Sequence, residues 1–222
     1  MGILTGYISL ACLLFLAAKF VTRKTKNQKL DRFFHRLHKP VSGIFLLTGI
    51  VHLFLVLPVW NTRSMPVNFS GVAALAILLL LIVACHGIKD AKKRMFWHRL
   101  LTIVLLILAV CHVTAYYIDF AQYQNHIKSI RIEGVDISGI PDGKYIGDYD
   151  AGYIYARVQV TVSGGKIADV EILEHQNERG EKAESITGRM VGEQKIDVDV
   201  VSGATNSSLV IKKACENALR EK

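Results

Sequence analysis

Four long apolar runs occupy the first 120 residues of this 222-residue chain and limit what it can fold into. Each is close to the ~20 residues that an α-helix needs to cross the hydrocarbon core of a bilayer. The runs are Ile3–Phe20, Val41–Trp60, Gly71–Ile88 and Leu100–Ile118. The first is followed, not preceded, by positive charge, so we expect a retained helix rather than a cleaved signal peptide. The sequence therefore predicts a membrane all-α four-helix bundle over residues 1–120.

Positive charge is concentrated in the same half of the chain. Residues 1–120 hold 14 Lys and Arg against 3 Asp and Glu, whereas residues 121–222 hold 13 against 16. The net charge of +8 therefore belongs to the apolar half and does not indicate a nucleic-acid partner. Lys19–Lys39 carries eight basic residues and Lys89–Arg99 five, but the loop Asn61–Ser70 carries one. The positive-inside rule then predicts a cytoplasmic location for both basic segments, with the N-terminus and residues 121–222 outside.

Two histidine pairs recur with equal spacing in the second and fourth segments. His38 and His52 are fourteen residues apart, and so are His98 and His112. Fourteen residues span about 21 Å and about four helical turns, so both members of a pair lie on nearly the same face. Because the two helices should run in the same direction, His38 can face His98 near the inner surface and His52 can face His112 further out. Two opposed imidazoles at two levels predict ligands for two stacked b-type haems, or one at least.

The spacing resembles the haem-bearing helices of ferric reductases and NADPH oxidases, where one other helix separates two His-x13-His helices. The resemblance covers only these helices, and no FAD- or NADPH-binding domain accompanies them in this sequence. His38 and His98 flank basic residues, a position that would also suit histidines at the membrane–water interface. Two alternatives stay open: His35, one turn earlier, could replace His38, and His86, near the cytoplasmic end of the third run, could replace His98.

Residues 121–222 have the pattern of a small α+β domain. Strands are expected at 130–132, 145–148, 153–162 and 167–173, and helices at 181–191 and 207–221. The third and fourth strands meet across Ser163-Gly164-Gly165, which is a hairpin signal. No Pro- or Gly-rich linker separates this domain from the fourth apolar run, so we expect a short, stiff connection around residues 116–126.

The segment Asp199–Thr205, with the sequence Asp-Val-Val-Ser-Gly-Ala-Thr, carries the most specific chemistry. Gly203 permits backbone dihedrals that a side chain would forbid, and Thr205 supplies a hydroxyl that could form a phosphoester. The next residues, Asn206–Ser208, favour the start of a helix. A phosphate on Thr205 would then lie at a helix N-terminus, where free N–H groups and the helix dipole favour an anion.

This segment resembles the Asp-x-x-Ser/Thr-Gly-Ala-Thr motif of the FMN-binding domain family. The resemblance extends to Asp142–Tyr145, the hairpin at Gly164-Gly165, Glu174–Gly180, Asp197–Asp199 and Asn206–Ser208. In that family the last threonine carries FMN as a phosphoester, which a flavin transferase installs outside the bacterial cytoplasmic membrane. The resemblance implies covalent FMN on Thr205 in an extracytoplasmic domain. It further implies cofactor binding by Asp199, Ser202, Gly203, Ala204 and His175.

Together, these features predict a transmembrane electron-transfer flavocytochrome in a bacterial cytoplasmic membrane, as an oxidoreductase or an electron-transfer module. Electrons would pass from the cytoplasmic side or the quinol pool through haem b to FMN, for reduction of an extracytoplasmic acceptor. Two other functions stay open. One is a flavin subunit of an ion-translocating redox complex of the Rnf or sodium-pumping NADH:quinone reductase type, and the other is a haem-free membrane-anchored flavoprotein. The donor, the acceptor and the oligomeric state are left open, since so small a bundle could need neighbouring copies to enclose two haems.

Overall fold

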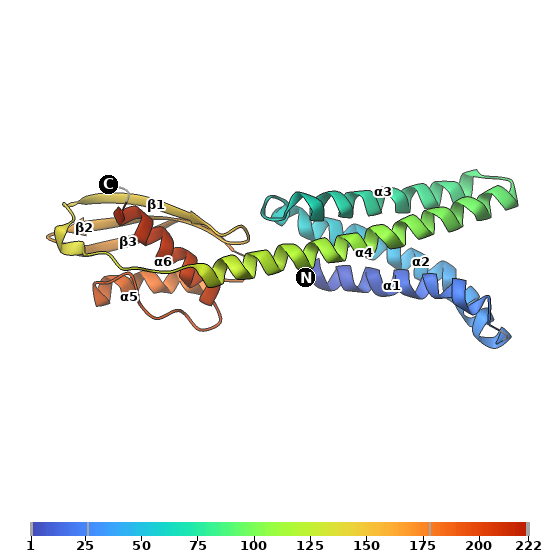
Figure 1. Cartoon of the computed structure of the whole chain (residues 1–222), viewed down its shortest axis with the longest axis horizontal. Coiled ribbons are helices and arrows are strands. Elements are labelled where there is room, and N and C mark those ends of the chain that lie inside the picture. Colours follow the sequence, from blue (N-terminus) through green and yellow to red (C-terminus); the bar gives the residue numbers. More distant parts are fainter. Residues whose placement is uncertain (1, 26, 178, 221–222) are drawn as a thin grey trace. The chain divides into compact units, whose positions relative to one another are not determined.

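A computed structural model describes residues 2–25, 27–177 and 179–220 (Figure 1). The chain divides into two compact units, Met1–Asp119 and Phe120–Lys222. The first contains α1 (Gly2–Thr22), α2 (Gln28–Val56), the 3₁₀ helix η1 (Leu57–Thr62), α3 (Met65–Gly87) and most of α4 (Ala91–Ser129). The helices α1 to α4 are long and apolar enough to cross a membrane, as the four apolar runs predicted.

Two of these helices begin well before the apolar run that predicted them. Asn27 caps α2 by accepting hydrogen bonds from the backbone N–H groups of Lys29 and Leu30, both at 3.1 Å. Asp90 likewise accepts from the N–H of Lys93 at 2.7 Å where α4 begins. Hydropathy marks only the apolar part of a helix, whereas these polar caps fix its start. His38 precedes the predicted run Val41–Trp60 but lies inside α2, well after the start of the helix.

The first unit packs around one buried side chain from each long helix. Leu13, Phe45, Leu78 and Leu105 form the centre of its apolar cluster. Large apolar side chains elsewhere on the helices point outward, and Val83, for example, is 66% exposed. Apolar surface this extensive is rare on soluble monomers, so the unit is compatible with insertion into a membrane.

The second unit is a three-stranded antiparallel sheet with helices. The strands β1 (Gly143–Asp150), β2 (Tyr155–Ser163) and β3 (Lys166–Gln176) lie in sequence order. The other elements are η2 (Ile137–Gly139), η3 (Glu181–Ser185), α5 (Ile186–Glu193) and α6 (Thr205–Arg220). The predicted β2–β3 hairpin is confirmed, with φ of 58° at Gly164 and 71° at Gly165, and such positive values suit a two-residue hairpin turn.

The strand predicted at 130–132 is wrong. These residues form no strand in the structure, although Ile130 is buried in the core and Ile132 packs against it. The alternation of apolar residues therefore reflects contact with the core rather than pairing in a sheet. The backbone N–H of the next residue, Glu133, donates to the buried carboxylate of Glu216 at 2.7 Å instead of to a neighbouring strand.

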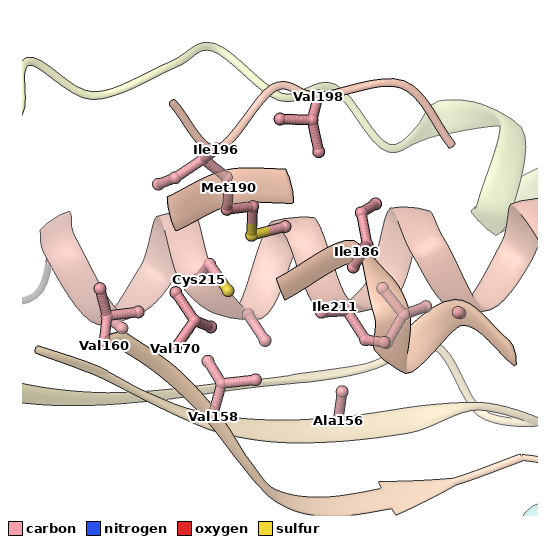
Figure 2. Close-up of a cluster of buried hydrophobic side chains, with 14 of the residues drawn as sticks. Ala156, Val158, Val160, Val170, Ile186, Met190, Ile196, Val198, Ile211 and Cys215 are labelled. Atoms are coloured by element: carbon pink, nitrogen blue, oxygen red, sulfur yellow. The ribbon is translucent and has the colours of Figure 1, made fainter. Parts of the chain in front are cut away.

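The core of the second unit lies between the sheet and the helices α5 and α6. Figure 2 shows Val158 and Val170 of the sheet facing Ile211 and Cys215 of α6, with Met190 of α5 close by. Cys215 is fully buried, and this burial raises the pKa of its thiol to about 12. Cys215 is therefore an unreactive core residue at physiological pH.

The contact between β1 and α6 requires a glycine at position 147. A Cβ atom there would lie 2.6 Å from Ala214 O and from Ala218 Cα, both backbone atoms of α6. We expect Gly147→Ala to lower the unfolding free energy of the second unit by about 3 kcal/mol, because the helix would have to move off the sheet. Urea unfolding of the full chain, with limited proteolysis as the measure of the unfolded fraction, would determine this change.

Gly188→Ala is the matched control for that prediction. Gly188 lies in α5, and a Cβ atom there would meet no atom within 4 Å. Alanine also favours a helix over glycine by up to about 1 kcal/mol, so this variant should be as stable as the wild type or slightly more stable. Equal urea midpoints for the two variants would contradict the packing argument.

Candidate functional site

The loop before α6 closes tightly onto the start of that helix. Ala204 N donates to Val201 O at 3.0 Å, and Gly203 between them has φ of 78°, which fits the third position of a type II turn. Ser208 Oγ accepts from Val201 N at 3.1 Å and donates to Ala204 O at 3.0 Å. The turn thus presents Thr205, which is exposed, as the first residue of α6.

The segment leading into this turn is anchored to α6 from the other side. Lys212, almost fully buried, pairs with the carboxylate of Asp197 and donates to Val198 O at 2.7 Å. The side chains of Asp199 and Ser202 are exposed, and that of Ala204 is buried. Of the residues predicted to bind FMN, all from Asp199 to Thr205 therefore lie on one short loop held against one helix.

The start of α6 has the groups that a phosphoester would need. The first N–H groups of an α-helix have no partner within the helix and carry its positive dipole end. In α6, which is 16 residues long, this first turn begins with the Thr205 hydroxyl. A phosphate attached there would meet these N–H groups without any rearrangement of the loop, so the site fits the phosphate of FMN.

His175 lies at the end of β3 and is almost fully buried. Its Nδ1 is 2.9 Å from Glu184 Oε1 and 3.2 Å from Asn177 Nδ2. Because a carboxylate only accepts, the Glu184 contact assigns the proton to Nδ1, and the donor Asn177 Nδ2 then bonds to His175 O instead of to Nδ1. Within the described residues, Nε2 of His175 is then a buried nitrogen without a partner.

A second buried polar atom without a partner lies at the start of α6. It is Ser207 Oγ, again within the described part of the chain. Gly180 packs directly on this serine, since a Cβ at Gly180 would lie 2.7 Å from Ser207 Cβ. Gly180 N in turn donates to Asn177 Oδ1 at 2.8 Å, so the loop that follows His175 reaches the first turn of α6. Buried polar groups normally have partners, so these two atoms, one of them two residues after Thr205, are candidates for contacts with a ligand.

Ser207 was predicted only as part of the helix start and not as a site residue. In the structure it shares the buried face of α6 with Ile211 and Ala214. A serine on the apolar face of an amphipathic helix is the signal that could have identified it. Glu178, another residue of the matched segment 174–180, lies outside the described residues.

In the first unit, the structure brings together His52 and His112, the pair that we predicted to lie further out and call the outer histidines. The ring centroids of His52 and His112 are 6.3 Å apart, with an angle of 85° between the rings. His52 Nδ1 lies 2.8 Å from Gly2 O, and His112 Nδ1 lies 3.1 Å from Val67 O. A carbonyl only accepts, so both Nδ1 atoms are protonated, and in the neutral rings each Nε2 keeps its lone pair for a metal.

The inner histidines face each other in the same way. The ring centroids of His38 and His98 are 6.0 Å apart, with an interplanar angle of 67°. His98 Nδ1 lies 3.5 Å from Cys85 Sγ. The alternative ligand His86 instead bonds to Ile82 O of its own helix at 2.8 Å and is exposed. His35, the other alternative, is exposed on α2.

Both distances suit two imidazoles that share one iron. Two metal–imidazole bonds of about 2.0 Å, each added to about 1.1 Å from the nitrogen to its ring centre, place the two centroids about 6.2 Å apart. Among the described residues, no three His, Cys, Asp or Glu gather as a metal-binding group. A two-histidine set suits haem, whose porphyrin supplies the other ligands, better than it suits zinc.

Space adjoins the outer pair. A cavity of about 130 Å³ is lined by His52, His112 and residues of all four long helices. Its small lining residues are Gly6, Ser9, Gly49, Gly71, Ala74 and Ala109. Small side chains therefore surround the space beside His52 and His112.

The second unit matches one known protein family. The family model of the FMN-binding domain matches residues 152–220, from just before β2 to the end of α6. No curated protein and no solved structure matches the chain. Residues 152–220 of the second unit therefore have the sequence of an FMN-binding domain, which suggests a flavin-containing electron-transfer protein, and four long apolar helices precede this domain in the chain.

Proposed function

We propose that this chain is a transmembrane electron-transfer flavocytochrome, with its FMN-binding domain outside a bacterial cytoplasmic membrane. The observation that carries the proposal is the occurrence, in one chain, of two facing histidine pairs and an FMN-binding domain. One basic segment lies where α1 connects to α2, and the other lies where α3 connects to α4. Both support a cytoplasmic location for the helix ends that they join.

His38 with His98, and His52 with His112, would each hold one b-type haem. When bound, the haems would supply one-electron relays and the FMN would supply one- or two-electron chemistry. The histidines fix the levels at which these groups lie, and the apolar helices exclude water around them. Two levels divide the ~30 Å hydrocarbon span into shorter distances than a single step would have to cover.

Thr205 would carry FMN as a phosphoester, made by a flavin transferase that can reach its exposed hydroxyl. Asp199, Ser202, Gly203 and Ala204 form the loop that presents this hydroxyl. His175 Nε2 and Ser207 Oγ, which are buried and have no partner among the described residues, would be free to bond the cofactor. A quinol or a cytoplasmic reductase would be the donor, and an extracytoplasmic molecule the acceptor.

The test is the cofactor content of the purified, cofactor-replete chain. A pyridine haemochrome assay should give two b haems per polypeptide, and the flavin absorbance after denaturation should give one FMN. One haem would keep electron transfer but remove one histidine pair from the proposal. A haem content near zero with full flavin would instead support a haem-free membrane-anchored flavoprotein, and stable co-purifying subunits would support an ion-translocating complex.

A further inference from the structure

The first unit contains an internal repeat of two helix pairs. Between α2 and α4 the histidines recur 60 residues apart, so that His38 and His52 match His98 and His112. Between α1 and α3 the offset is 65 residues, which matches Thr5-Gly6 with Ser70-Gly71. The same two offsets relate all four buried side chains at the centre, Leu13 with Leu78 and Phe45 with Leu105. Each half of the unit is thus a helix with a hydroxyl–glycine pair followed by a His-x13-His helix.

The hydroxyl–glycine pair of each half contacts the outer histidine of the same half. A Cβ at Gly6 would lie 3.0 Å from Cε1 of His52, and a Cβ at Gly71 would lie 3.1 Å from Cε1 of His112. Real Cβ contacts are rarely so short, so each imidazole occupies the space that a glycine leaves open. An alanine at either glycine would push the ring away from its position.

The hydrogen bonds at the two places correspond as well. Thr5 Oγ1 donates to Gly2 O at 2.8 Å, and His52 Nδ1 bonds to that same carbonyl. Thr5 Oγ1 also lies 3.5 Å from His52 Nδ1. This arrangement fixes the proton on Nδ1 and the ring plane together.

In the second half, Ser70 Oγ can donate to Pro66 O at 2.6 Å or to Val67 O at 3.0 Å, and His112 Nδ1 bonds to Val67 O. Ser70 Oγ lies 3.1 Å from His112 Nδ1. Gly2 and Val67, the two acceptors, are again 65 residues apart. Repetition of the whole arrangement around both histidines indicates a shared requirement rather than chance packing.

The inner level is built differently. His98 Nδ1 lies near Cys85 Sγ, and the residue that matches Cys85 in the first half is Phe20, which has no polar side-chain atom. The correspondence in hydrogen bonding is therefore confined to the outer level, although the histidines themselves repeat at both levels.

We propose that Thr5-Gly6 and Ser70-Gly71 are matched positioning elements for the two ligands of the outer haem. The inference rests on the proposed function and deepens it, because it names residues that hold His52 and His112 in the orientation and tautomer that leave Nε2 for iron. Hydrogen bonds to the far nitrogen of a ligating histidine typically change metal affinity by about 10- to 100-fold. The glycines leave room for the imidazole rings, and the hydroxyls can bond to the same carbonyl oxygens as the histidine Nδ1 atoms.

The test compares Gly6→Ala and Gly71→Ala with Gly43→Ala in the full chain. Gly43 lies in α2 between the two histidine levels, is exposed, and would meet no atom within 4 Å as an alanine. We expect Gly43→Ala to keep two haems. Gly6→Ala and Gly71→Ala should each retain about one haem per chain. The haem at the outer level should be lost at least tenfold more readily than in the wild type. Redox titration and electron paramagnetic resonance should show that the remaining haem is unchanged.

Thr5→Val and Ser70→Ala provide a milder test that does not depend on steric pressure. Each should keep both haems but shift the midpoint potential and the resonance of one of them, the same one in both variants. A wild type with no haem would overturn the proposed function and this inference together. A wild type with haem, but with unchanged content and spectra in all four variants, would overturn the inference alone.

Discussion

Thr205→Val is expected to abolish the flavin that stays attached after denaturation. Valine has nearly the shape of threonine but no hydroxyl, so no phosphoester can form at this position. Thr205 is exposed at the start of α6, and surface substitutions of this kind usually change stability by no more than about 0.5 kcal/mol. The domain should therefore fold normally, and in-gel flavin fluorescence should fall to background while the haem content stays as in the wild type.

Thr205→Ser is the matched control, because it keeps a hydroxyl at the same place. It should retain fluorescence well above that of the valine variant, to a degree set by the tolerance of the transferase. Wild-type fluorescence in Thr205→Val would place the linkage elsewhere, and Ser202 and Ser207 would be the next residues to replace. Loss of fluorescence together with loss of folded protein, seen by circular dichroism, would mean that the threonine has a structural role.

The helices and the hairpin were predictable because their signals are local. The length of the four apolar runs is enough to predict α1 to α4, and the pair Gly164-Gly165 is enough to predict the β2–β3 turn. The starts of α2 and α4 were missed because Asn27 and Asp90 act through single hydrogen bonds that hydropathy does not record. The supposed strand at 130–132 failed for the opposite reason, since buried residues can alternate without a neighbouring strand.

The candidate sites divide in the same way. Thr205 stands in a motif that is contiguous in sequence, and the histidine pairs need only one spacing and one helix direction. The contacts around them join residues far apart in the chain. Gly6 of α1 packs against His52 of α2, and Gly180 packs against Ser207. No local pattern contains such information. The offset of 65 residues between the two hydroxyl–glycine pairs, together with the offset of 60 residues between the histidine pairs, is the sequence signal that could have revealed the repeat.

His112→Ala is expected to remove one haem and leave the flavin in place. His112 and His52 face each other at 6.3 Å, so removal of one imidazole leaves a single ligand at the outer level. The haemochrome assay should fall from two haems per chain to about one, and in-gel flavin fluorescence should be unchanged. His86→Ala is the matched control, because His86 bonds only to Ile82 O of its own helix among the hydrogen bonds described for it, and it should keep both haems.

Combining substitutions makes this prediction sharper, because residues that hold one group act as a unit. His52→Ala with His112→Ala should lose no more haem than either change alone, since both remove the same haem. His98→Ala with His112→Ala should lose both haems, since each change empties a different level. Added imidazole should restore haem to His112→Ala by filling the space that the side chain leaves beside Gly71. If the first double variant lost both haems, or the second only one, the pairing of His52 with His112 and of His38 with His98 would be wrong.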